Sequence, residues 1–320
     1  MEPPILADLD AWRMSLERRP FTFDAVMRRE QGDDFVDELA KLRPNTTIPA
    51  ALAEPAKEAW LHYNSTGGMP EAVNTWEDER DNELVRQVQR SIWDSYERDL
   101  THYAPMQWMK MEKILLSVPH QLVEKNQKFT YNRVKDGWRA GDLRAPINTL
   151  VRSGVVVKVP RVENPTPPLA EVSNRRNFKL YTPDVGLLRG LASFTFPLSS
   201  DWFPRDDPRL DAIVQTYVLS HLLSFGMTPY FWHSGNTAII EFLVEFQGHA
   251  IPIKVESADR SASKCLSAYC ENTCPQLAVR MTPNGPFDIT KKFGTRILTM
   301  PLYLAWNLPA YLEEAVEDNH

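Results

Sequence analysis

The chain has 320 residues, of which 43% are hydrophobic and 10% aromatic, and its formal net charge is −6. It is long enough for two or more domains with substantial cores, and it contains no low-complexity tract. No run approaches the roughly 18 apolar residues of a membrane span, and the N-terminus lacks the features of a signal peptide, so we expect a cytoplasmic protein with no membrane partner.

The first hundred residues predict a helical region. Residues 21–62 contain short apolar stripes at helical spacing, separated by proline and asparagine breaks. Gly67 and Gly68 interrupt a helix, and Pro70 is suited to the first turn of the next. Residues 78–103 predict one long helix, and we place the boundary of this region at residue 105.

Residues 106–190 predict a winged helix-turn-helix. Helices are expected near 111–118, 130–136 and 141–153, followed by a strand over 155–159, a proline-rich loop over 160–176 and a strand over 178–181. The third helix would be the recognition helix. Its polar side chains, with two on the wing, are the candidate nucleic-acid contacts: Arg144, Asn148, Arg152, Arg175 and Arg176.

The charge distribution favours a polyanion as partner of this region. Residues 106–182 carry a surplus of eight positive charges, whereas the rest of the chain carries a net charge of −14. A basic segment in an otherwise acidic protein favours duplex DNA as the binding partner of that segment. The alternative is a basic surface that docks on an acidic neighbour in the same chain.

The order of elements after residue 209 predicts an α/β domain. A helix over 210–225 precedes strands over 229–233, 238–246 and 251–257, a helix that opens near 261–263, and a late strand over 297–302. The predicted fold class is therefore α+β multidomain.

Two of these strands carry charges on an otherwise apolar sheet. If they pair as a hairpin through residues 247–249, Glu241 approaches Lys254 and Glu256, which share one strand face. Such a group can hold a divalent cation and activate water. The alternative is the solvated face of a half-buried strand.

The sequence does not support a zinc site, a P-loop ATP site or a serine nucleophile. Cys265, Cys270 and Cys274 lie close together, but no second cysteine or histidine pair stands at zinc-site spacing, so free thiols are expected. The chain has no Gly-x-x-x-x-Gly-Lys-Ser/Thr motif and hence no ATP site of that kind. His233 and Ser234 are adjacent, but no nucleophile elbow accompanies them.

Several stretches, in order over residues 18–305, resemble the C-terminal part of bacterial and archaeal AAA-type ATPases that carry a domain of unknown function. They are Arg19-Pro-Phe-Thr-Phe-Asp24, Gly67-Gly-Met-Pro-Glu-Ala-Val73, Ser91-Ile-Trp-Asp-Ser-Tyr-Glu-Arg-Asp99, Val118-Pro-His-Gln-Leu122, Lys128-Phe-Thr-Tyr131, Phe178-Lys-Leu-Tyr-Thr-Pro-Asp-Val-Gly-Leu-Leu188 and Ile251–Ser257.

The resemblance implies three parts without the P-loop ATPase domain. Residues 1–105 would correspond to the helical lid, 106–190 to a winged helix-turn-helix, and 191–320 to a domain resembling the PD-(D/E)xK nuclease fold. Whether an ATPase was lost, split into another gene or removed stays open.

The resemblance also implies a nuclease-like site at Asp211, Glu241, Lys254 and Glu256. Asp211, Glu241 and Glu256 would be the ligands of Mg²⁺ or Mn²⁺ in an active enzyme. Lys254 and Glu256 are exchanged relative to the family's Glu-x-Lys pair, and Ile239 replaces another acidic residue often seen there. A shift of two residues moves each group about 6.6 Å along a strand, so the site is expected to be degenerate and the protein non-catalytic.

Three functions follow as hypotheses. The first is a non-catalytic nucleic-acid-binding or regulatory protein, with no ATP and no other cofactor. The second is a metal-dependent nuclease with a rearranged site. The third is a protein-interaction subunit acting with a separate ATPase, or self-associating, through residues 20–60.

Overall fold

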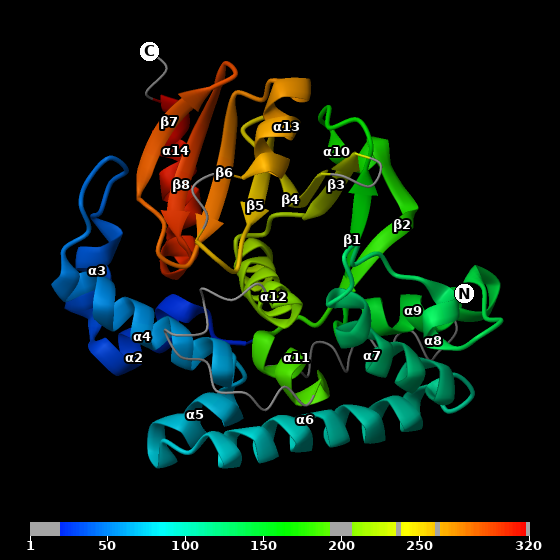
Figure 1. Ribbon diagram of the computed structural model, residues 1–320. Coiled ribbons are helices and arrows are strands. Elements are labelled where there is room, and N and C mark those ends of the chain that lie inside the picture. Colours follow the sequence, from blue (N-terminus) through cyan, green and yellow to red (C-terminus); the bar gives the residue numbers. More distant parts are fainter. Residues whose placement is uncertain (1–19, 193–206, 235–237, 260–262, 318–320) are drawn as a thin grey trace.

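The computed structural model describes residues 20–192, 207–234, 238–259 and 263–317. These residues form an α+β protein with a helical N-terminal region and, in the C-terminal half, a mixed eight-stranded sheet with helices (Figure 1). The predicted α+β class is confirmed at this level. No helix in the described ranges is long and apolar enough to cross a membrane.

The helical region follows the predicted breaks. α4 ends at Thr66, and α5 opens with Pro70 at its first turn. The side chain of Asp81 caps the long helix α6 by accepting hydrogen bonds from the amides of Glu83 and Leu84. The helices are α2 (Phe23–Gln31), α3 (Asp33–Ala40), α4 (Ala50–Thr66), α5 (Pro70–Glu79) and α6 (Asn82–Tyr103).

The next segment has the predicted order of three helices and two strands. Its elements are α7 (Trp108–Leu122), α8 (Tyr131–Val134), α9 (Ala140–Arg152), β1 (Val157–Val162), α10 (Leu169–Val172) and β2 (Ser173–Tyr181). α7 is longer than predicted and continues through Pro119, because buried Val118 and Leu122 extend its apolar face. β1 and β2 are also longer, because their pairing resumes beyond an irregularity after Pro160.

The sheet joins strands that are distant in sequence. Its order is β2-β1-β3-β4-β5-β6-β8-β7. β1 runs parallel to β3, with Arg161 beside Phe231, so the predicted wing strands continue into the main sheet. The remaining strands are β3 (Tyr230–Ser234), β4 (Ala238–Phe246), β5 (His249–Val255), β6 (Leu277–Thr282), β7 (Asp288–Lys292) and β8 (Thr295–Pro301).

Helices cover both faces of the sheet. Alternate strand residues enter two separate buried clusters: Val279 packs on the side of α12, and Ala278 on the side of α13. α13 begins at Lys264 with Ser263 as its cap; positions 261–262, where its opening was predicted, lie outside the described residues. The remaining helices are α11 (Val185–Ala192), α12 (Pro208–Ser224), α13 (Lys264–Thr273), η2 (Leu302–Asn307) and α14 (Leu308–Glu317).

One hydrophobic core includes residues from all three predicted regions. Tyr217 of α12 makes edge-on ring contacts with Phe23, Trp60 and Tyr63 of the N-terminal helices, at centroid distances of 5.9–6.0 Å. The same cluster extends to Leu143 of α9. The domain boundaries at residues 105 and 190 therefore stay predictions, because buried contacts cross both of them.

Candidate functional site

The glycine pair and the Thr-Pro-Asp-Val-Gly stretch meet in space. Asp184 is fully buried and accepts a 2.7 Å hydrogen bond from the amide of Gly68 and a 3.0 Å bond from the amide of Leu187. A Cβ atom on Gly67 would lie 2.4 Å from the Asp184 carboxylate, and one on Gly186 would lie 2.2 Å from the Thr66 carbonyl oxygen. Because these distances leave no space for a Cβ atom, both positions require glycine, and the contact has a structural role.

Burial raises the pKa of Asp184 above its usual value, although hydrogen bonds from backbone amides, including those of Gly68 and Leu187, oppose the rise. The carboxylate connects the loop after α4 to the start of α11 and leaves little room for a substrate. Two of the stretches on which the predicted resemblance rests, those that begin at Gly67 and at Phe178, therefore meet in a packing contact.

The predicted charged residues of the C-terminal half do come together. Asp211, Glu241, Lys254 and Glu256 line one polar pocket of about 100 Å³. Asp211 is supplied by the first turn of α12, Glu241 by β4 and Lys254 by β5, and Glu256 directly follows the end of β5 at Val255. Strand periodicity and the expected hairpin predict the approach of Glu241 to Lys254 and Glu256, whereas Asp211 is expected there only from the resemblance.

The turn of the hairpin sets the position of Glu241. Phe246 pairs with His249, so Gln247 and Gly248 form a two-residue turn, and both have positive φ (48° and 78°). Phe242 then lies opposite Ile253, and Glu241, one residue earlier, faces Lys254.

Both glutamates of the pocket are held in ion pairs. Glu241 Oε1 lies 2.7 Å from Lys254 Nζ, with the two side chains 5% and 12% exposed. Its second oxygen accepts a 3.0 Å hydrogen bond from the amide of Val255. Glu256 Oε2 lies 2.7 Å from Arg280 Nε of β6. Burial lowers the pKa of Lys254, but attraction to Glu241 and their hydrogen bond outweigh it, so the pKa is raised overall.

Sequence reasoning missed three residues near this pocket. Arg280 lies on β6, which is buried along its whole length. Gln215, one turn after Asp211 on α12, lines the pocket and accepts a 3.0 Å hydrogen bond from the Tyr181 hydroxyl. An arginine inside the apolar run of residues 277–282 was the available signal, because a buried arginine requires a partner.

The third missed residue is Lys179 of β2, which is fully buried. Its Nζ donates a 2.9 Å hydrogen bond to Gln127 Oε1 and lies 5.0 Å from the centroid of the Phe231 ring. Burial lowers its pKa to about 8, attraction to Glu241 opposes the shift, and repulsion by Lys254 adds to it. The neighbourhood of Glu241 is therefore rich in positive charge.

The donor set does not fit a divalent cation in this arrangement. A magnesium site requires several carboxylate oxygens around an open position, but one oxygen of Glu241 binds the Lys254 ammonium and the other a backbone amide. Among the described residues, no group of three or more His, Cys, Asp or Glu is placed to hold a metal ion. The metal assignment of Asp211, Glu241 and Glu256 stays a prediction that this geometry does not favour.

A second set of predicted residues forms a basic surface on α9 and the β1–β2 pair. Arg144 and Asn148 of α9 are exposed, as are Arg175 and Arg176 of β2, while Arg152 is half-buried. The half-buried Lys158 of β1 joins them, with its Nζ 4.2 Å from the centroid of the Phe178 ring.

Like charges lie close together on this surface. Burial lowers the pKa of Lys158, and repulsion by Arg175 and Arg144 lowers it further. Within the described ranges, Arg144 and Arg175 form no ion pair with a carboxylate. Glu163 and Glu171 line the same pocket as Arg175 and Arg176, but among the described residues neither forms an ion pair with them.

Two other predicted features are the apolar stripes of residues 20–60 and the three cysteines. The apolar stripes of residues 20–60, including Phe23, Met27 and Leu39, are buried in the core, and no large hydrophobic side chain described in that segment is exposed. Among the described residues Cys265, Cys270 and Cys274 form no disulfide, and Cys270 is buried.

The comparisons with known proteins are sparse. No curated protein and no solved structure matches the chain. No match names an AAA-type ATPase, so that resemblance stays a prediction. A family model described as a domain of unknown function (DUF8612) matches residues 57–197, which include the Asp184 contact and the basic surface but not Glu241, Lys254 or Glu256.

Proposed function

We propose that this protein is a non-catalytic nucleic-acid-binding protein. In this proposal residues 106–190 are a winged helix-turn-helix that binds duplex DNA, and residues 191–320 are a degenerate relative of the PD-(D/E)xK nucleases. The chain would be related to the C-terminal part of AAA-type ATPases and would use no ATP.

The observation that carries the proposal is the cluster of Arg144, Lys158 and Arg175 on α9 and the β1–β2 pair. Arg144 and Arg175 are each close enough to repel Lys158, and binding of a polyanion would relieve this repulsion. Arg144 and Asn148 are one helical turn apart and exposed, as expected for side chains that reach base edges. Arg175 and Arg176 on β2 suit phosphate contacts beside the groove.

The state of the polar pocket supports a non-catalytic role. The Lys254 ammonium binds Glu241, and Glu256 is paired with Arg280. Hydrolysis by a nuclease of this fold needs carboxylates that hold a metal and water. Both glutamates would first have to leave nearly buried ion pairs.

Binding of a labelled 30-base-pair duplex at several salt concentrations tests the proposal. Affinity should fall with salt, and R175A/R176A should lower the magnitude of the log–log slope by about 2, since each lost phosphate contact contributes about 0.9. The control K291A/K292A removes two exposed positive charges from β7, at the opposite edge of the sheet, and should leave the slope unchanged. No binding at about 50 mM salt, or equal effects of both double variants, would refute the proposal.

A metal-dependent nuclease is the second candidate, favoured by the convergence of Asp211, Glu241 and Glu256 on one pocket. Incubating plasmid and single-stranded DNA with Mg²⁺ or Mn²⁺ tests it. Cleavage that is lost in both Glu241→Gln and Glu256→Gln would favour the nuclease over the non-catalytic protein. Cleavage that survives both changes would exclude this pocket as its source.

A further inference from the structure

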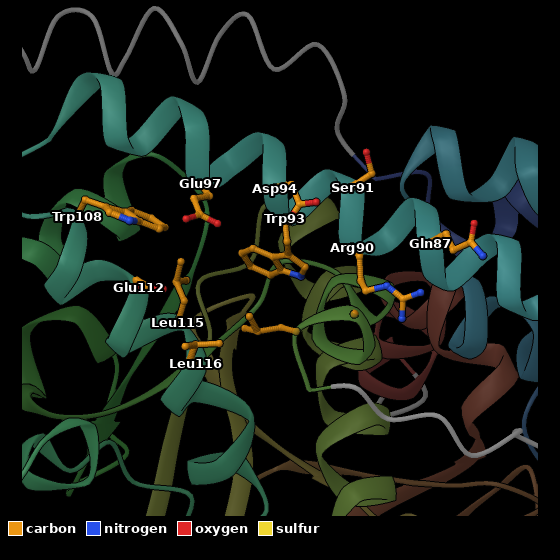
Figure 2. A pocket seen from close by; sticks show the side chains of 12 residues that line it. Gln87, Arg90, Ser91, Trp93, Asp94, Glu97, Trp108, Glu112, Leu115 and Leu116 are labelled. Atoms are coloured by element: carbon orange, nitrogen blue, oxygen red, sulfur yellow. The ribbon is translucent and has the colours of Figure 1, made fainter.

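A groove separate from the polar pocket lies between α6, α7 and α11. It has a volume of about 450 Å³ and is lined by residues that include Trp93, Trp108, Leu115 and Leu116. Figure 2 shows Arg90, Trp93 and Glu97 pointing from α6 toward the side where Leu115 and Leu116 of α7 lie. No predicted function makes use of this groove.

The groove is elongated. Its lining runs along α6 from Gln87 to Glu97, which at 1.5 Å per residue corresponds to about 15 Å, or nearly three helical turns. This length suits a peptide segment that lies along the groove better than a compact ion. Leu116 is 51% exposed, so the apolar surface is open at this point.

The charge of the groove selects the occupant. Asp94, Glu97 and Glu112 line it, and within the part of the chain that is described none of their three carboxylates takes part in a hydrogen bond or ion pair. Arg90, the cation of the lining, already lies 3.3 Å from Glu83. The groove therefore combines an apolar floor with three carboxylates that lack counter-charges.

The apolar surface continues beyond the groove along α7. Met109, Glu112 and Leu116 lie at i, i+3 and i+7 and share one helix face. Met109 is 67% exposed, and the preceding Met106 is 95% exposed. Exposed methionines are typical of surfaces that adapt to a partner helix.

We propose that this groove binds a basic amphipathic helix of a partner protein. Leucine-sized side chains of that helix would pack on Trp93, Trp108 and Leu116, and its lysines or arginines would pair with Asp94, Glu97 and Glu112. The same carboxylates repel nucleic acid, so this surface serves a purpose different from that of the basic surface on α9.

The test uses the full chain and a fluorescein-labelled 18-residue peptide of lysine and leucine, with leucines at helical spacing. A second peptide carries glutamate in place of every lysine. Fluorescence anisotropy should show binding of the lysine peptide and at least tenfold weaker binding of the glutamate peptide. No binding of the lysine peptide at about 100 μM protein, an affinity weaker than about −5.5 kcal/mol, would overturn the proposal.

Two variants test the groove itself. D94N/E97Q/E112Q should weaken binding about tenfold, or about 1.4 kcal/mol over three partly exposed pairs. The control D34N/E54Q/E58Q removes the same charge from exposed positions on α3 and α4 and should change affinity less than twofold. Equal losses in both would show attraction by net charge alone and overturn the proposal.

Leu116→Gln probes the apolar contact at an exposed position where folding is preserved, and should weaken binding at least threefold. Unchanged affinity in this variant would contradict the role of the apolar floor. Circular dichroism of each variant checks that the fold is intact.

Discussion

Breaking the ion pair between Lys254 and Glu241 by replacing either residue alone is expected to destabilise the fold strongly. The charged atoms are 2.7 Å apart, and at an effective dielectric constant of about 20 their attraction is about 6 kcal/mol. Desolvation of both groups offsets much of this gain, but removal of one partner leaves the other charge buried and unpaired. Such changes cost about 3–5 kcal/mol, and we expect about 3 kcal/mol for Lys254→Met and for Glu241→Gln.

The double variant K254M/E241Q separates pairing from packing. It leaves no unpaired charge at this position, so its loss of stability should be at least about 2 kcal/mol smaller than the sum of the single losses. Urea unfolding, followed by tryptophan fluorescence and far-ultraviolet circular dichroism, measures all four proteins. The chain has nine tryptophans, and coincident curves from the two probes would establish a two-state comparison.

Additive losses, within about 0.5 kcal/mol, would refute a coupled ion pair. The stability of the wild type in MgCl₂ tests the same conclusion independently. A site with a dissociation constant of about 1 mM would stabilise the wild type by about 1.4 kcal/mol in 10 mM MgCl₂. We expect no gain relative to NaCl of equal ionic strength, because the ammonium of Lys254 binds the Glu241 oxygen that a metal would use.

Two further predictions concern packing and pH. Gly68→Ala should lower stability by about 3 kcal/mol or more, because its Cβ would lie 2.1 Å from the Phe21 carbonyl oxygen. Gly141→Ala, on the open face of α9, should instead stabilise the protein by about 0.5–1 kcal/mol. Thermal unfolding measures both variants, and equal effects would contradict the steric argument. Between pH 7.5 and 9.5 the free energy of unfolding of the wild type should rise by about 2 kcal/mol relative to that of Lys179→Met. The reason is that the pKa of Lys179 is about 8 in the folded protein against a usual 10.5, so the unfolded chain binds the extra proton in this window. Urea titrations measure this difference, and parallel curves of stability against pH would show that the pKa of Lys179 is not lowered.

Much of the secondary structure was predictable from local patterns. The break at Gly67–Gly68, the start at Pro70 and the paired strands around Gln247–Gly248 follow from backbone preferences that act within a few residues. The convergence of Glu241 and Lys254 was predictable for the same reason, because a two-residue turn defines the register of the hairpin.

The predicted end of a helix at Pro119 was wrong, because tertiary contacts there outweigh the local signal. Pro119 suggested the end of a helix, but the buried face of α7 continues to Leu122. The partner surface expected on residues 20–60 stays a prediction. The large hydrophobic side chains described there pack in the core, and exposed ones near a groove, such as Met109 and Leu116, lie on α7.

The sequence by itself determined the α+β class, the order of most elements and the facing of Glu241 and Lys254, because these depend on periodicity and turn chemistry over short distances. Only the tertiary structure decided that Glu256 pairs with Arg280, that Lys179 is buried near Glu241, and that α6, α7 and α11 enclose an acidic apolar groove. These contacts join segments that are far apart in the chain, and their stability comes from burial and charge pairing, for which local sequence carries no periodic signal.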